Sequence, residues 1–88
     1  MADTINLSVI TPDGSAFKDS VSFISLPVEN GSIGVLSNHA PLLTAIKAGQ
    51  IRCRYDSGDT VLIEVSDGIA DINHNTASVL VSTAKKVD

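Results

Sequence analysis

The stretch from Asn30 to Thr44 most constrains the fold, because glycine and proline interrupt its short apolar runs. Gly31 and Gly34 permit backbone angles that a Cβ atom would penalise. Pro41 fixes its own φ and shifts Ala40 towards an extended conformation. We therefore expect two extended segments that meet at a rigid, polar corner beside Pro41. Such a shape suits a contact surface, and it offers neither an activated nucleophile nor a phosphate cradle.

The rest of the chain alternates apolar and polar residues, a pattern typical of half-buried β-strands. In Gln50–Tyr55, for example, Ile51 and Cys53 fall on one face and the two arginines on the other. The expected strands are Ile5–Val9, Val21–Leu26, Ile33–Leu36, Leu42–Ile46, Gln50–Tyr55, Thr60–Val65, Ile69–Ile72 and Ala77–Ser82. We predict an all-β fold, an antiparallel β-sandwich or flattened barrel of about eight to ten short strands, forming a single domain over residues 1–88.

Turn residues separate these strands. Thr11–Gly14, Asp56–Asp59 and Asn73–Asn75 are rich in the residues that favour tight turns. We also expect Ser66–Gly68 to close a hairpin, because Asp-Gly between β-rich segments favours one.

A bulge, a strand end and a C-terminal tail are expected as well. The alternation in Val21–Leu26 slips near Ile24, which predicts a β-bulge, and Pro27 is expected to end that strand. Residues Thr83–Asp88 form a polar C-terminal tail in which no regular structure is expected.

Composition excludes several classes of protein. Hydrophobic residues make up 43% of the sequence and aromatic residues 3%, with no Trp, so the core must be aliphatic. The formal net charge of −4 and the lack of a basic run argue against a nucleic-acid or anionic-membrane surface. Because no signal peptide or bilayer-spanning segment is visible, we expect a monomer of cytosolic character, or one that docks on a membrane-embedded partner.

Candidate catalytic and metal-binding groups are scattered. Cys53, the one cysteine, is expected to be a buried apolar residue rather than a reactive thiol. His74 lies in an Asn-rich turn and is expected to be solvated, whereas His39 either braces the corner through a carbonyl or contacts a partner. Glu64 either faces outward or pairs with an arginine of a neighbouring strand. We expect no catalytic residue, no metal site, no cofactor and hence no enzyme activity.

The stretch from Asn30 to Thr44 resembles part of a known family. Gly31–Leu36, followed by His39–Ile46 and then Gly49, closely resembles the signature of the ε subunit of F-type ATP synthases. Three further segments resemble that family's first strand and turn, its later hairpin and its last strand: Leu7–Gly14, Val65–Ile72 and Val79–Ala84. The resemblance extends over nearly the whole chain.

This resemblance implies a non-catalytic β-sandwich at the foot of the central stalk. In the family this domain holds the γ subunit, stands on the polar loops of the membrane c-ring and turns with both, so torque passes between ion translocation and ATP synthesis. Its place would be peripheral, on the cytoplasmic face of the energy-transducing membrane, with membrane contact only through the complex. By correspondence, the loop that faces the c-ring comprises Glu29, Asn30, Gly31 and Ser32. The region that packs towards γ comprises His39, Pro41, Leu42, Leu43 and Thr44.

The chain departs from the family pattern in two respects. Many members carry an acidic residue where this chain has Ser32, so a charge pair with the c-ring is either absent or carried by Glu29. Typical members also continue into a C-terminal helical hairpin that restrains hydrolysis and in some binds ATP. This chain stops at Asp88, so neither property is carried over to it.

One alternative function is that of a small ligand- or carbohydrate-binding β-sandwich, which the many short strands and polar turns favour. The lack of Trp and the presence of a single tyrosine, Tyr55, count against an aromatic platform for a sugar. A hydrolase is disfavoured because no base–nucleophile pair can be named.

Overall fold

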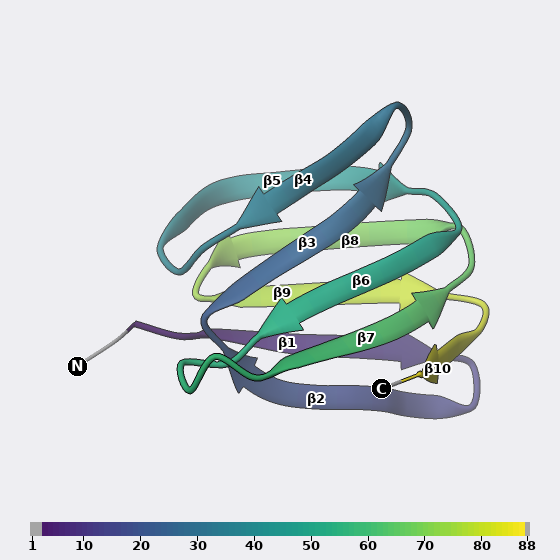
Figure 1. Cartoon of the computed structure of the whole chain (residues 1–88). Helices are drawn as coiled ribbons and strands as arrows, with labels where there is room; N and C mark the ends of the chain where they lie inside the picture. Colours follow the sequence, from purple (N-terminus) through teal and green to yellow (C-terminus); the bar gives the residue numbers. More distant parts are fainter. Residues whose placement is uncertain (1–2, 88) are drawn as a thin grey trace.

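Two five-stranded sheets pack face to face in the computed structural model, which describes residues 3–87 (Figure 1). Sheet A has the order β2-β1-β9-β8-β5, and sheet B has the order β10-β7-β6-β3-β4. The strands are β1 (Ile5–Thr11), β2 (Gly14–Val21), β3 (Phe23–Val28), β4 (Gly31–Val35), β5 (His39–Ile46), β6 (Gly49–Arg54), β7 (Thr60–Val65), β8 (Gly68–His74), β9 (Thr76–Val81) and β10 (Ala84–Lys86). The described residues contain no helix, so the predicted all-β class is confirmed. Of the predicted domain, Met1, Ala2 and Asp88 lie outside the described residues.

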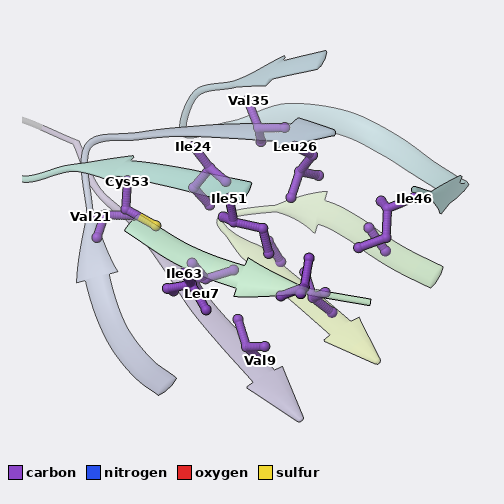
Figure 2. Close-up of a cluster of buried hydrophobic side chains, with 14 of the residues drawn as sticks. Leu7, Val9, Val21, Ile24, Leu26, Val35, Ile46, Ile51, Cys53 and Ile63 are labelled. Carbon is purple, nitrogen blue, oxygen red and sulfur yellow. The ribbon is translucent and has the colours of Figure 1, made fainter. Parts of the chain in front are cut away.

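An aliphatic core fills the space between the sheets (Figure 2). In β6, Ile51 and Cys53 are fully buried whereas Arg52 and Arg54 are exposed, as the alternation predicted. The buried residues are Ile5, Leu7, Val9, Val21, Ile24, Leu26, Val35, Ile46, Ile51, Cys53, Val61, Ile63, Val65, Ala70, Ile72, Ala77, Val79 and Val81. No polar or charged side chain of residues 3–87 is buried among them. The hydrophobic effect and close packing therefore hold the sheets together, and burial raises the pKa of the Cys53 thiol to about 12.

All neighbouring strands pair antiparallel except one pair. β1 runs antiparallel to β2 but parallel to β9, where Val9 lies opposite Val79. Each sheet keeps two open edges, formed by β2 and β5 in sheet A and by β10 and β4 in sheet B. Because a barrel has no edges, the fold is a sandwich, and the flattened barrel allowed by the sequence is excluded. Figure 1 shows the edge strands β4 and β5 on the same side of the molecule.

Three of the four predicted turns close hairpins, and one does not. Thr11–Gly14 joins β1 to β2, Asp56–Asp59 joins β6 to β7, and Asn73–Asn75 joins β8 to β9. The hairpin predicted at Ser66–Gly68 is wrong, because this segment carries the chain from β7 in sheet B to β8 in sheet A. A tight turn redirects the chain, but it does not choose the strand that pairs next.

Two connections that cross between the sheets are tied together. The Ala48 N–H, between β5 and β6, donates to Asp67 Oδ1, between β7 and β8, at 2.7 Å. Gly68 is required beside this bond, because a Cβ atom there would overlap the Leu80 carbonyl of β9. The glycine predicted to bend the chain instead allows close approach of β8 and β9.

The irregularity predicted near Ile24 lies two residues earlier. Ile24 pairs regularly with Val35 and Cys53, and the alternation breaks at Ser22, where the chain leaves β2 and enters β3 in the other sheet. Pro27 does not end the strand, which continues to Val28. β6 pairs with β3 only as far as Ser25, so no ladder bond on that side requires the N–H that Pro27 lacks.

Two polar segments pair as strands although their sequences lack a clear alternation. The predicted tail contains the three-residue strand β10, in which Ala84 lies opposite Val65 of β7. The residues before Val21 form β2, whose side chains are almost all exposed. Both are edge strands with little core to bury, so their sequences carry little of the pattern that reveals the other strands.

A hydrogen bond also joins the sheets at the protein surface. Tyr55 follows β6 in sheet B, and its hydroxyl donates to Asp19 Oδ2 in β2 of sheet A at 2.7 Å. The Ser20 N–H donates to the other carboxylate oxygen at 2.8 Å. These bonds, that of Tyr55 first, lower the pKa of Asp19, and the same bond raises the pKa of Tyr55 to about 12. The pair is therefore strongest when Asp19 is ionised and Tyr55 is protonated.

Gly68→Ala should destabilise the fold more than Gly34→Ala. Alanine at Gly68 meets the backbone of β9, whereas alanine at Gly34 meets only the Phe23 ring edge at 3.1 Å. We expect Gly68→Ala to lower the free energy of unfolding by about 1–3 kcal/mol or more, as overpacking does, and Gly34→Ala by less. Urea denaturation of both variants measures the difference. Equal losses would show that β8 and β9 separate without cost.

Tyr55→Phe should reduce stability in a pH-dependent manner. The Asp19 pKa lies below its ordinary value of 3.8, so the stabilisation is present above that pH and is lost as pH falls through the folded pKa. The Tyr55 pKa is raised from 10.0 to about 12, so the stabilisation is present below pH 10 and is lost as pH rises through about 12.

Denaturation of wild type and Tyr55→Phe over a pH series, with an NMR titration of the Asp19 carboxyl, tests this expectation. In an Asp19→Ala background, which removes the acceptor, the tyrosine substitution should change stability little. A difference between wild type and Tyr55→Phe that stays constant across pH would contradict the role of this hydrogen bond.

Candidate interaction surfaces

The predicted loop of Glu29, Asn30, Gly31 and Ser32 is the turn between β3 and β4. Val28 pairs with Gly31, which leaves Glu29 and Asn30 at the tip. Asn30 has a φ of 70° and Gly31 a φ of 149°, and Asn and Gly tolerate positive φ better than other residues. All four predicted residues are exposed. The turn thus presents one carboxylate to solvent at an end of the sandwich.

Gly34 has a different role from the predicted one. It lies opposite Ser25 in β4, and it is not among the residues with positive φ. Its missing side chain instead leaves room for the Phe23 ring. The special backbone angle expected at Gly34 is therefore wrong, whereas that at Gly31 is confirmed.

The predicted polar corner is an irregularity at the start of edge strand β5. His39 pairs with His74 of β8, and pairing resumes only at Leu42, so Ala40 and Pro41 have no partners in the ladder. Proline suits such a position because it cannot donate a ladder hydrogen bond. The His39 Nδ1 lies 2.6 Å from the Ala40 carbonyl oxygen and donates to it. The brace predicted for His39 is therefore confirmed.

β5 divides the other predicted residues between its two faces. Leu42 lies opposite the buried Ile72 and is itself half-buried against the core. Thr44, two residues further along, is half-buried on the same side. Leu43 lies opposite Asp71 on the outer face of sheet A and is 71% exposed. Only Leu43 of these three is free to contact a partner through its whole side chain.

The Glu29 turn lies near the end of β5, whereas the predicted γ residues extend along this strand from His39 at its start to Thr44 (Figure 1). The Lys47 N–H, just beyond the end of β5, donates to the Pro27 carbonyl at 3.0 Å, close to the Glu29 turn. His39, at the start of β5, lies instead beside the turn between β8 and β9, where the Asn38 N–H donates to Asn75 Oδ1 at 2.8 Å. The length of β5 therefore separates His39 from the Glu29 turn, and Leu43 and Thr44 lie between them.

The outer face of sheet A carries a row of exposed apolar side chains that was not predicted from the sequence. Ala45 lies opposite Ile69, Ile69 opposite Leu80, and Leu80 opposite Ile10, so the row crosses β5, β8, β9 and β1. Ile69 is 49% exposed, Leu80 51% and Ile10 36%. We call these four residues the apolar row, and Leu43 stands beside it on β5. The missed signal is that Ile10, Ile69 and Leu80 occupy outward positions where the alternation predicts polar residues.

The apolar row is continuous with the Glu29 turn. A shallow hollow of about 450 Å³ lies along the row. A second hollow of about 240 Å³ is bordered by Glu29 and Lys47. Asp67 and Gly68 line both hollows. One end of the sandwich therefore combines an apolar surface with an exposed acidic turn.

The polar half of the same sheet face carries a third hollow of about 540 Å³. It is lined by Asn6, Ser8, Lys18, Asp19, Ser20, Thr76 and Ser78. The Ser20 hydroxyl donates to Asn6 Oδ1 at 2.6 Å. None of these lining residues is aromatic, so the hollow lacks the ring on which a bound sugar would stack.

The remaining candidate groups do not converge on a site. Glu64 is exposed and lies opposite Gln50 and Lys85, so it faces outward and has no arginine directly across from it. His74 is exposed at its turn with a φ of 53°, as predicted. Within residues 3–87, no group of three His, Cys, Asp or Glu residues is placed to hold a metal ion. No helix of the described chain is long and apolar enough to cross a membrane.

Comparison with known sequences identifies relatives over the whole chain. The profile of the family described as "ATP synthase, Delta/Epsilon chain, beta-sandwich domain" matches residues 4–87. The ATP synthase epsilon chain of Desulfitobacterium hafniense (strain Y51) is 40% identical, over 100% of this chain and 68% of the relative. That of Staphylococcus aureus (strain JH9) is 36% identical, over 94% and 62% respectively. The chain thus spans about two thirds of the length of these curated relatives.

Solved structures show the same fold. A chain in the Euglena gracilis mitochondrial ATP synthase, solved as an OSCP/F1/c-ring assembly, matches with a TM-score of 0.88 at 20% identity, over 98% of this chain and 55% of that chain. A chain in the central stalk/c-ring structure of the Tetrahymena thermophila enzyme matches with a TM-score of 0.74 at 15% identity, over 96% and 67%. At these identities the likeness establishes the β-sandwich architecture.

Proposed function

The chain belongs to the family of the ATP synthase delta/epsilon chain beta-sandwich domain, and from this premise we propose that it is a non-catalytic rotor element of an F-type ATP synthase. In this role it couples the γ subunit to the membrane c-ring during ion-driven ATP synthesis. It lies peripherally at the cytoplasmic face of the energy-transducing membrane and contacts that membrane only through the complex. The family match over residues 4–87 is the observation that carries the proposal.

The physical properties of the domain support a mechanical role. Its core is aliphatic and close-packed, and its surface is tied across the sheets by Tyr55 and Asp19. A coupling element must transmit force without deforming, and close-packed interiors have low compressibility. The described residues offer surfaces for partners, and none of the candidate groups converges into reactive machinery.

We assign the γ contact to the apolar row together with Leu43. An exposed apolar patch with a polar rim is typical of a protein interface. Leu43 and the row lie on one face, and Asp71 supplies polar character beside them. Leu42 and Thr44 support this face from the core side, while His39 and Pro41 hold the start of β5. The five residues predicted from the family thus act with the row rather than alone.

We assign the c-ring contact to the turn of Glu29, Asn30, Gly31 and Ser32. The turn is exposed at its tip, and Glu29 is its one carboxylate. With Ser32 in place of the acidic residue common in the family, Glu29 provides the charge that meets the polar loops of the ring. The turn adjoins the apolar row through Asp67 and Gly68, so both proposed partners contact one end of the sandwich.

Leu43→Asp should weaken γ binding, whereas Leu36→Asp should not. Leu43 and Leu36 are 71% and 59% exposed, but Leu36 lies in the loop between β4 and β5, outside the proposed surface. We expect Leu43→Asp to weaken binding at least about tenfold, equivalent to about 1.4 kcal/mol. Titration calorimetry with isolated γ measures the affinity, and circular dichroism checks that both variants are folded. Unchanged affinity in Leu43→Asp, or equal weakening in both variants, would place the γ contact elsewhere.

Glu29→Lys should weaken the association of the γ–chain subcomplex with detergent-solubilised c-ring, whereas Asp56→Lys should not. Both carboxylates are exposed in hairpin turns, but Asp56 lies in the β6–β7 turn. We expect roughly two- to tenfold weaker binding at low salt, because exposed ion pairs are individually weak. The difference should shrink at about 0.5 M salt as charges are screened. Sensitivity to Asp56→Lys with none to Glu29→Lys would reverse the assignment.

A further inference from the structure

The outer face of sheet B carries a concentration of positive charge that the proposed function does not use. Arg52 and Arg54 project from β6, which has a neighbouring strand on each side, and Lys85 projects from β10. Glu64 is the acidic residue among the outward strand residues of this face. Among these strand residues three positive charges thus accompany one negative charge, although the whole chain has a net charge of −4. Asp56 and Asp59 lie in the turn that follows Arg54.

The two arginines are not opposed by acids in the ladder. Arg52 lies between Leu62 of β7 and Ser25 of β3. Arg54 lies between Thr60 of β7 and Phe23 of β3. The Arg54 guanidinium stands 5.3 Å from the centre of the Phe23 ring, close enough for a cation–π interaction.

Phe23 is held in place from both sides. Its ring edge packs over the bare backbone of Gly34, where a Cβ atom would come within 3.1 Å, and its face meets Arg54. Gly34 and Ser25 have small side chains or none, so few atoms rise above the sheet beside Arg52 and Phe23. Half-buried Phe23 and Leu62 add apolar area next to the charged groups. The arrangement therefore combines two exposed guanidinium groups, one of which rests on Phe23, with apolar contacts.

We propose that this face, defined by Phe23, Arg52, Arg54 and Leu62, is a docking surface for an acidic protein segment. Alternate residues of one strand lie about 6.5–7 Å apart, so the two arginine side chains leave β6 at a spacing that suits a pair of carboxylates. Glu or Asp residues two apart in an extended segment, or four apart on a helix, meet this requirement. Guanidinium groups bind carboxylates through two parallel hydrogen bonds.

The shape of the face favours a protein segment over a small anion. The hollows described above border other residues and do not include either arginine. A flat, open face cannot enclose a small ligand, whereas a longer peptide segment can contact several strands at once. This surface is distinct from the apolar row, because it lies on the outer face of the other sheet. It is also distinct from the Glu29 turn, which joins β3 to β4 beyond the part of β3 that pairs with β6. Its test is therefore independent of the contacts proposed for γ and the c-ring.

The test is an NMR titration of the ¹⁵N-labelled 88-residue chain with an acetylated decaglutamate peptide. We expect saturable shifts confined to β3, β6 and β7, with affinity falling as salt rises from about 50 to 200 mM. Arg52→Glu/Arg54→Glu should weaken binding at least about tenfold, and Phe23→Ala should weaken it several-fold through loss of the ring beside Arg54.

A matched control separates local from global charge. Lys18→Glu/Lys47→Glu changes the net charge equally at exposed positions away from this face, and it should alter affinity less than about threefold because distant surface charges are screened. Equal weakening in the two double variants, shifts centred on other strands, or no saturable binding would overturn the proposal. So would tighter binding of inorganic tripolyphosphate than of decaglutamate at the same residues, which would identify a phosphate site.

Discussion

Packing of the two sheets across one aliphatic core fixes every surface of this domain. The core is built from alternate residues of the strands, so the same alternation that buries Ile51 and Cys53 exposes Arg52 and Arg54. A slip of one residue in any ladder would exchange the buried and exposed sets. Since no described polar side chain is buried, the core has no side-chain hydrogen bonds that could hold an alternative register. Which residues lie on the outer faces therefore depends on the packing of the two sheets against each other.

Properties that depend on local sequence could be predicted, and those that depend on distant partners could not. Period-two alternation identified the core-forming strands because each residue's burial follows from its neighbours in the chain. The strand with which each strand pairs could not be predicted in this way. Ser66–Gly68 has the sequence of a hairpin turn, yet it crosses between sheets because β8 pairs with β9 and β5. Ser22 likewise marks a crossing that resembles a bulge when only the local pattern is considered.

The same distinction applies to the candidate surfaces. The Glu29 turn and the His39 brace are formed within a few residues, and both could be predicted from the sequence. The apolar row joins Ile10 to Ile69 and Leu80, which are far apart in the chain and adjacent only through two ladders. Each of these residues alone is an unremarkable exposed hydrophobe. They form one surface only because of the register between their strands, and the sequence pattern does not specify the register between distant strands.

Mechanical coupling between two partners requires their contacts to be fixed relative to one another, and the topology provides a short connection. Ala45 and Ile69 of the apolar row lie next to two of the connections that cross from one sheet to the other. These crossings are joined by the hydrogen bond between Ala48 and Asp67, and the Lys47 N–H extends the link to Pro27 beside the Glu29 turn. Force applied at the turn therefore reaches the row through backbone and two hydrogen bonds, without passing through a flexible loop. A domain joined only by its core would let the sheets shear, whereas these ties restrain the end at which both contacts are proposed.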